Sequence, residues 1–121
     1  MTRNKQSTRY FSHRQETQVA KTVGGKVVPN SGAIKFGAGD VNTDLFLIEC
    51  KTCMTEKESF SIKKEWLEKN REEACAVGKD DSALAFNFGP DTPNYYVIET
   101  KLFKKLINCL EVENESDKNN P

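Results

Sequence analysis

The chain has 121 residues, of which 36% are hydrophobic and 30% are charged, and its formal net charge at pH 7 is zero. This composition is ordinary for a soluble globule, and the length is sufficient for one compact domain with a real core. The sequence contains no run of eighteen or more apolar residues, and its polar, basic N-terminus lacks the apolar segment of a signal peptide. We therefore expect a cytoplasmic protein without membrane association.

The zero net charge hides a charge gradient along the chain. Residues 1–39 carry seven Lys and Arg side chains against one acid, and residues 40–110 carry ten against thirteen acids. Residues 111–121 carry four acids against one Lys. A basic end beside an acidic middle suggests a polyanionic partner with a divalent metal nearby. A flexible, solvated basic tail is the alternative, and composition gives the two readings similar weight.

The first elements are predicted to be a basic arm over residues 1–8 and a helix over 8–23. Phe11 and Val19 belong to the sparse apolar face of that helix, and two consecutive glycines end it. A short strand over 26–28 follows, and it runs into a segment rich in turn-forming residues.

A hairpin is predicted next, with its turn at Asn42-Thr43. Its second strand is apolar, begins at residue 44 or 45, and ends at Lys51. Apolar residues on both faces of this strand are typical of a central strand that is covered on both sides.

The remaining elements are predicted in this order: a helix over 59–79, strands over 83–88 and 95–98, a short amphipathic helix over 101–110, and an acidic disordered tail over 111–121. Ser59 or Ser61 is the expected cap of the first of these helices, and Trp66 is expected to be a core or dimer contact. The order α-β-β-β-α-β-β-α predicts one α+β domain over 1–110, with a central mixed β-sheet flanked by helices.

The end of the central strand carries charged residues. Side chains alternate along a strand, so Leu47, Glu49 and Lys51 share one face. Asp40 comes from the preceding strand and approaches Glu49 if the hairpin loop is loose or bulged. Asp44 falls on the opposite face in a regular strand.

Two carboxylates that converge beside a lysine make a hard-oxygen site suited to Mg²⁺. Such a metal can polarise a phosphodiester and acidify a bound water, while the lysine positions the attacking hydroxide. The alternative is an ordinary Glu–Lys pair at a strand end, because the tripeptide E-x-K alone is widespread.

The cysteines are interpreted as buried free thiols rather than as disulfides or a zinc site. Cys50 and Cys53 have zinc-like spacing, but Cys75 and Cys109 are isolated in predicted helices and His13 is the only histidine. A zinc-binding interaction module is kept as an alternative class of function.

Several motifs in one order resemble a known superfamily. The segment "GDVNTDLFLIECK" resembles the core of the PD-(D/E)XK nucleases, and the wider segment "RQETQVAKTVGGKVVPNSGAIKFGAGDV…LIECK" resembles their Holliday-junction-resolvase branch. In that branch a helical Glu, a Ser-Gly turn, a hairpin Asp and an E-x-K strand end follow one another. Glu16, Ser31, Asp40, Glu49 and Lys51 match these positions, within a resemblance that covers roughly residues 12–100.

The resemblance implies a restriction-endonuclease-like core and a role for each matched residue. Asp40 and Glu49 would bind Mg²⁺, for which Mn²⁺ is expected to substitute, with help from the backbone carbonyl of Cys50. Lys51 would orient or activate the water, and Glu16 would support a metal-bound water.

The sequence departs from the family pattern in the hairpin. Gly39 stands where the family often has Pro, and nine residues separate Asp40 from Glu49, which is at the short end of the pattern. If the alignment slips, Asp44 becomes the hairpin acid instead of Asp40.

The expected partner is DNA. Ser31 would touch substrate phosphate or the site itself, and basic residues would hold the backbone. The predicted DNA contacts are Arg14, Lys21, Lys26, Ser31 and Lys35.

These features predict a Mg²⁺-dependent DNA endonuclease, specifically a homodimeric resolvase of four-way junctions, since two symmetric cuts need two identical sites. Its compactness also suits a phage protein that acts in a bacterial host. The alternatives are a nicking, repair or restriction-type endonuclease on duplex DNA, and a non-catalytic DNA-binding protein with a degenerate nuclease fold.

Overall fold

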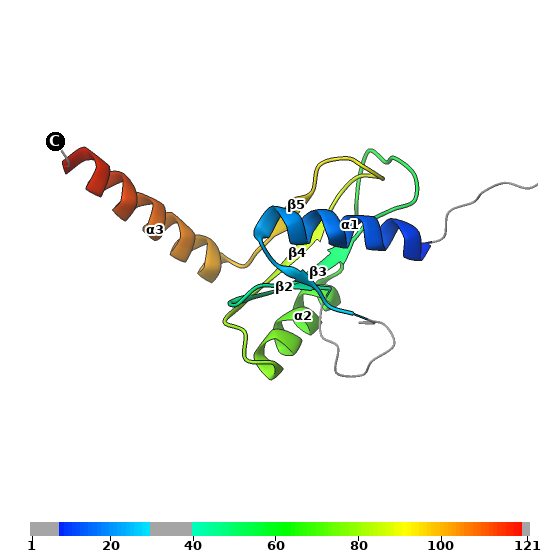
Figure 1. Cartoon of the computed structure of the whole chain (residues 1–121), viewed down its shortest axis with the longest axis horizontal. Coiled ribbons are helices and arrows are strands. Elements are labelled where there is room, and N and C mark those ends of the chain that lie inside the picture. The colour runs from blue at the N-terminus through cyan, green and yellow to red at the C-terminus, as the bar shows by residue number, and fades with distance from the viewer. Residues whose placement is uncertain (1–7, 30–39, 120–121) are drawn as a thin grey trace, which may run out of the picture.

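The computed structural model describes residues 8–29 and 40–119, and within them it contains three helices and five strands (Figure 1). In chain order they are α1 (Thr8–Val23), β1 (Lys26–Val27), β2 (Val41–Asn42), β3 (Phe46–Lys51), α2 (Lys64–Ala76), β4 (Asp81–Phe86), β5 (Tyr95–Val97) and α3 (Thr100–Asn119). The predicted order of elements is confirmed, and the bounds of the first helix are those that its apolar spacing indicated. The predicted basic arm over 1–8 lies outside the described residues, except for Thr8, which begins α1.

The strands form one mixed sheet in the order β1-β2-β3-β4-β5. β3 and β4 are parallel and pair from Phe46↔Asp81 to Lys51↔Phe86, while the other neighbours are antiparallel. The parallel pair requires a crossover, which α2 supplies. The charged end of β3 therefore lies at the same edge of the sheet as the end of β4.

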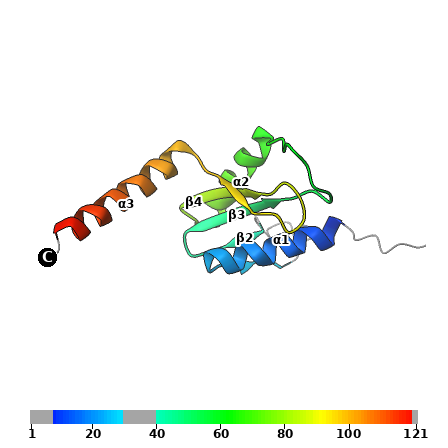
Figure 2. The ribbon, with the colours of Figure 1, turned by 90° about the horizontal axis from the view of Figure 1, so that it is seen from above.

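Helices α1 and α2 cover opposite faces of the sheet (Figure 2). On the α1 side, Val19 packs with Val41, Ile48 and other small apolar side chains in one buried cluster. Leu47 and Leu84 alternate to the other face and are almost fully buried. Full burial of a side chain of this size stabilises the fold by about 1.5–3 kcal/mol.

The hairpin turn lies two residues later than predicted. β2 extends through Asn42, and the turn is closed where the Thr43 amide donates to the Phe46 carbonyl at 3.0 Å. The Phe46 amide donates in return to the Thr43 hydroxyl, also at 3.0 Å. Because this side chain satisfies the backbone of the turn, the two-residue loop is Asp44-Leu45 rather than Asn42-Thr43.

The start of α2 also differs from the prediction. The helix begins at Lys64, its N-cap residue Lys63 makes no side-chain cap hydrogen bond, and neither Ser59 nor Ser61 caps it. Between those serines, Phe60 stacks on Phe86, with ring centroids 5.2 Å apart. This contact with β4 holds the preceding segment outside the helix.

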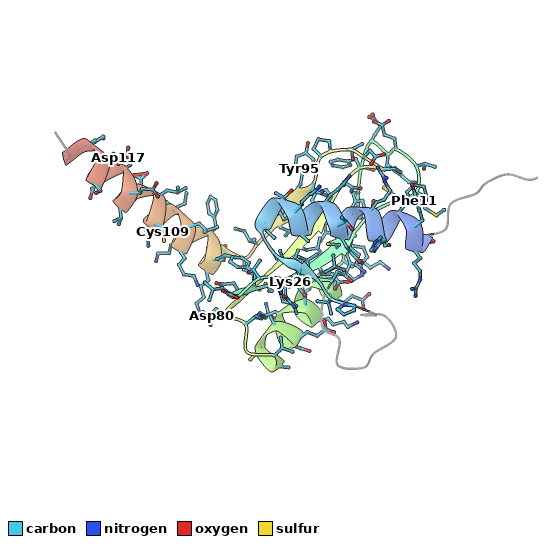
Figure 3. The ribbon with its side chains drawn as sticks, in the orientation of Figure 1. Phe11, Lys26, Asp80, Tyr95, Cys109 and Asp117 are labelled. Carbon is cyan, nitrogen blue, oxygen red and sulfur yellow. The ribbon has the colours of Figure 1, made fainter. Side chains whose placement is uncertain are left out.

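The expected boundary between helix and acidic tail is wrong, because α3 continues through Asn119. No glycine or proline interrupts residues 100–119, and the segment is rich in Glu and Lys, which favour helix. α3 stands away from the sheet in both views (Figures 1 and 2). Cys109 and Asp117 both lie on this projecting part (Figure 3).

Within the described ranges, no helix has the length and apolar character needed to cross a membrane.

Candidate functional site

The end of β3 presents an acid and a base on one face. Lys51 Nζ lies 3.4 Å from Glu49 Oε2, and the two side chains are only 29% and 25% exposed. Burial raises the pKa of Glu49, the Asp40 carboxylate raises it further, and Lys51 opposes both effects. Glu49 is thus a half-buried carboxyl whose charge depends on its neighbours.

Asp40 is held against the same strand end by two backbone contacts. Its amide donates to the Ile48 carbonyl at 2.9 Å, and its Oδ2 accepts a hydrogen bond from the Cys50 amide at 2.8 Å. Because the turn lies later than predicted, no bulge in the loop is needed for this approach. Asp44 is exposed in the hairpin loop and contributes its carbonyl oxygen to Lys79. The structure therefore brings Asp40, and not Asp44, to Glu49.

Glu16 reaches this cluster from α1. Its carboxyl is hydrogen-bonded to Asp40, and burial, followed by the charges of Asp40 and Glu49, raises its pKa to about 7. A proton on Glu16 can be donated to Asp40, and with a pKa of about 7 Glu16 keeps this proton to a higher pH than an isolated Glu does. The acid of α1, the acid before β2 and the acid of β3 thus lie near one another.

The carboxylates of this cluster would repel one another when all are ionised. This repulsion is reduced by a proton shared between two carboxyl groups, by the positive charge of Lys51, or by a bound cation. The donors are all oxygens, namely Asp40, Glu49 and the backbone carbonyl of Cys50, and this set fits Mg²⁺ better than a soft metal. Among the described residues, no group of three or more His, Cys, Asp or Glu side chains is placed so that it could hold a metal ion. The predicted set has two such side chains as direct ligands, Asp40 and Glu49, together with the Cys50 carbonyl and Glu16 acting through a water, and its binding of a metal stays a prediction.

The four cysteines do not gather in the structure. Cys50 is buried and Cys53 is half-buried, but Cys75 and Cys109 are exposed, so the prediction of buried thiols is wrong for the last two. They are exposed because they lie on the outer sides of α2 and α3. Burial, together with the nearby acidic charges, raises the pKa of the Cys50 thiol well above its ordinary value. That thiol belongs to the buried cluster under α1, and the Cys50 backbone amide binds the Asp40 carboxylate.

A buried amide that the sequence did not single out fixes the strand end. Gln15 is 2% exposed, and its Nε2 donates to the Lys51 carbonyl at 2.8 Å and to Asn94 Oδ1 at 3.1 Å. Asn87 donates to the same Asn94 oxygen, which links the ends of β3 and β4 to the loop before β5. The sequence does indicate that Gln15 is unusual, because it lies four residues from both Phe11 and Val19. This spacing puts its polar side chain on the buried face of α1.

Trp66, which was expected to be a core or dimer contact, is half-buried. Lys51 Nζ lies 4.4 Å from the centroid of its ring. This distance places the ammonium over the aromatic face, where the ring quadrupole attracts a cation. Trp66 also lines a pocket of about 300 Å³, and the residues around that pocket are Glu49, Lys51, Glu65, Trp66, Lys69 and Asn70. Lys51 is therefore held from two sides, by Glu49 and by Trp66.

The predicted DNA contacts are only partly described. Arg14 pairs with Asp91, and both side chains are well exposed. Lys21 is exposed on α1 and Lys26 on β1 (Figure 3). Ser31 and Lys35 lie outside the described residues. The described basic residues are therefore open to solvent, but they do not converge on the acidic cluster as its own side chains do.

No family model, curated protein or solved structure matches this chain. A functional interpretation therefore rests on the residues at the end of β3 and on their geometry.

Proposed function

We propose that the chain is a Mg²⁺-dependent DNA endonuclease with a PD-(D/E)XK-type site on a restriction-endonuclease-like core, acting as a structure-selective resolvase of four-way junctions. The observation that carries the proposal is the convergence of Glu16, Asp40, Glu49 and Lys51 at one strand end. These residues are scattered over 36 positions of sequence, and α1, the hairpin and β3 bring them together. A surface Glu–Lys pair would not require the other two acids.

In this proposal the chain's own oxygens form the metal site. Asp40, Glu49 and the Cys50 carbonyl would hold Mg²⁺, and the ion would supply Lewis-acid activation of a phosphodiester and of a bound water. The hydrogen bond from the Cys50 amide keeps the Asp40 carboxylate turned toward β3.

Lys51 has the properties of a positioning and charge-stabilising group. The ion pair with Glu49 and the face of Trp66 both restrict the rotamers of its side chain. A fixed ammonium beside the reacting phosphate would stabilise the negative charge that develops on the phosphoryl oxygens. Glu16, with its pKa near 7, is suited to accept a proton from the attacking water or to hold that water in place.

DNA would be bound mainly through its backbone. A domain of this size offers little surface for reading base edges, so recognition would depend on phosphate position and DNA shape. The basic residues of the N-terminal third would contribute this contact. A homodimer would cut a junction symmetrically, because a two-fold axis places identical sites on both continuous strands.

The test is cleavage of end-labelled four-way junction, duplex and single-stranded DNA by the full chain in Mg²⁺ or EDTA. We expect paired symmetric nicks on the junction that disappear in EDTA. Mg²⁺-dependent cutting of duplex alone would support the nuclease activity but contradict the assignment as a junction resolvase. Tight DNA binding without cutting of any substrate would contradict catalysis and favour a degenerate nuclease fold.

A further inference from the structure

Helix α3 exposes a large apolar face to solvent. Its base is fixed to the body by Leu102, which is 5% exposed, and by Lys105 Nζ, which lies 2.9 Å from Asp81 Oδ2. Beyond this point the helix projects from the sheet in both views (Figures 1 and 2). Four large apolar side chains on it are between 40% and 61% exposed: Phe103, Leu106, Ile107 and Leu110.

These four side chains lie on one side of the helix, which we call the α3 apolar face. Their spacing of three, one and three residues confines them to one stripe, whereas Val112 falls on the opposite side. Leu106 also lines an adjoining groove of about 790 Å³, so apolar surface continues from the helix onto the body. Other apolar residues of that groove are Leu45, Phe46, Tyr96 and Ile98. A continuous exposed apolar surface of this kind marks an interaction site.

The charges of α3 indicate what covers this face. Residues 100–110 carry three lysines and no acid, and residues 111–119 carry four acids against one lysine. Two identical helices packed antiparallel through residues 103–110 would place the start of the acidic segment of each, at Glu111, on the basic segment of the other. A parallel arrangement would instead place like charges together. The pattern is thus self-complementary in the antiparallel arrangement, in which a two-fold axis perpendicular to the helices relates the two copies of a homodimer.

The same opposite charges can be assigned to one specific pair of residues. Lys104 and Glu111 are seven residues apart and therefore lie on the same flank of the α3 apolar face. In an antiparallel pair, residues on the same flank of the two helices face each other. Lys104 of one copy would then face Glu111 of the other, and this contact would occur twice in each dimer.

We propose that α3 is a dimerisation helix that packs antiparallel on the α3 of a second copy through Phe103, Leu106, Ile107 and Leu110. This interface does not depend on the nuclease proposal. The α3 apolar face and its groove include none of Glu16, Asp40 and Glu49, so the dimer leaves both acidic clusters uncovered. If the nuclease proposal also holds, the same helix supplies the second active site that a symmetric cut needs.

The test is the mass of the full chain in solution, measured by light scattering behind a sizing column. Wild type is expected at twice the chain mass of 13.7 kDa. Leu110→Asp is expected to raise the dissociation constant by about 100-fold or more, because each dimer loses two buried leucines. Val112→Asp is the matched control, since it adds the same charge at an exposed site on the opposite side of the same helix. A wild-type monomer, or equal dissociation of both variants, would overturn the proposal.

A charge exchange gives a second test that leaves the apolar face intact. Lys104→Glu and Glu111→Lys are each expected to weaken the dimer by about 3- to 10-fold, and the double variant is expected to regain most of the loss. Circular dichroism of each variant reports whether α3 stays helical. If the double variant is as weak as the two single changes combined, the antiparallel pairing is overturned.

Discussion

Three carboxyl groups share the half-buried end of β3, and their protonation is linked. Burial and the Asp40 charge raise the pKa of both Glu16 and Glu49, and for Glu16 the result is a pKa of about 7 against an ordinary value of 4.5. Near pH 7, Glu16 is therefore about half protonated in the metal-free site, whereas it is ionised in the unfolded chain. Mg²⁺ and this proton would compete for the same oxygens.

The metal-free protein is expected to lose stability as pH rises from about 4.5 through 7. In this window the folded state binds more protons than the unfolded state, so the free energy of unfolding falls with pH. For a partly exposed group we expect Glu16 to contribute about 1–2 kcal/mol of this loss. Urea unfolding in EDTA at pH 5 and pH 8 measures it.

Glu16→Gln should remove most of the pH slope and leave the smaller part that comes from Glu49. Glu72→Gln, on the exposed side of α2, is the control and should keep the wild-type slope. An unchanged slope in Glu16→Gln would show that Glu16 does not carry the proton.

Trp66 is expected to act on catalysis through Lys51. Trp66→Leu removes the aromatic face and should slow single-turnover cleavage about 10-fold, which corresponds to a cation–π contact of about 1.4 kcal/mol. Trp66→Phe keeps a ring and should retain most of the rate. Equal rates for the Leu and Phe variants would assign Trp66 a packing role only.

At the scale of elements, the hairpin decides which acid belongs to the site. The Thr43 side chain closes the turn, β2 pairs Val41 with Ile48, and Asp40 thereby reaches the Cys50 amide. Asp44 remains in the exposed loop.

Magnesium is therefore expected to stabilise wild type and the Asp44→Asn variant but not Asp40→Asn. A free Mg²⁺ concentration ten times the dissociation constant should add about 1.4 kcal/mol to the free energy of unfolding. Thermal unfolding with Mg²⁺ and with EDTA, above pH 7, measures the difference. If Mg²⁺ stabilised Asp40→Asn but not Asp44→Asn, Asp44 rather than Asp40 would be the metal ligand.

Gln15 links α1 to the ends of two strands, and this predicts a large effect of a small change. Gln15→Leu leaves the Lys51 carbonyl without its side-chain donor and should destabilise the fold by about 2–3 kcal/mol. Gln18→Leu, one turn later on the same helix, loses only a long contact to Asp91 and should cost about 0.5 kcal/mol or less. Equal losses in urea unfolding would contradict the role given to Gln15.

Regular elements of this chain could be predicted from sequence because their signals are local. Apolar spacing defined α1, and alternation along β3 placed Glu49 beside Lys51. The start of α2 and the hairpin turn could not be predicted, because Phe60 and Thr43 act there through contacts with β4 and with a backbone amide. The helix and turn propensities of individual residues do not predict such contacts.

For the whole molecule, the sequence predicted the order of elements and a mixed sheet. It allowed Asp40 to approach Glu49 in a loose hairpin, and only the family resemblance assigned Glu16 to the same site. It did not predict Gln15 and Trp66, because the interactions of both arise only when helices pack across the sheet. The length of α3 was also missed, since its acidic half was interpreted as a disordered tail. As a helix, that half gives α3 its opposite charges at the two ends.

If the cluster at the end of β3 is a nuclease site, as we propose, cleavage should depend on Lys51. The measurement is the single-turnover cleavage rate of a four-way junction by wild type, Lys51→Ala and Lys64→Ala in Mg²⁺. Lys64 is an exposed lysine at the start of α2 and serves as the matched control. We predict a loss of at least about 100-fold for Lys51→Ala and a rate near wild type for Lys64→Ala. A Lys51→Ala protein that is folded and cuts at the wild-type rate would contradict the account.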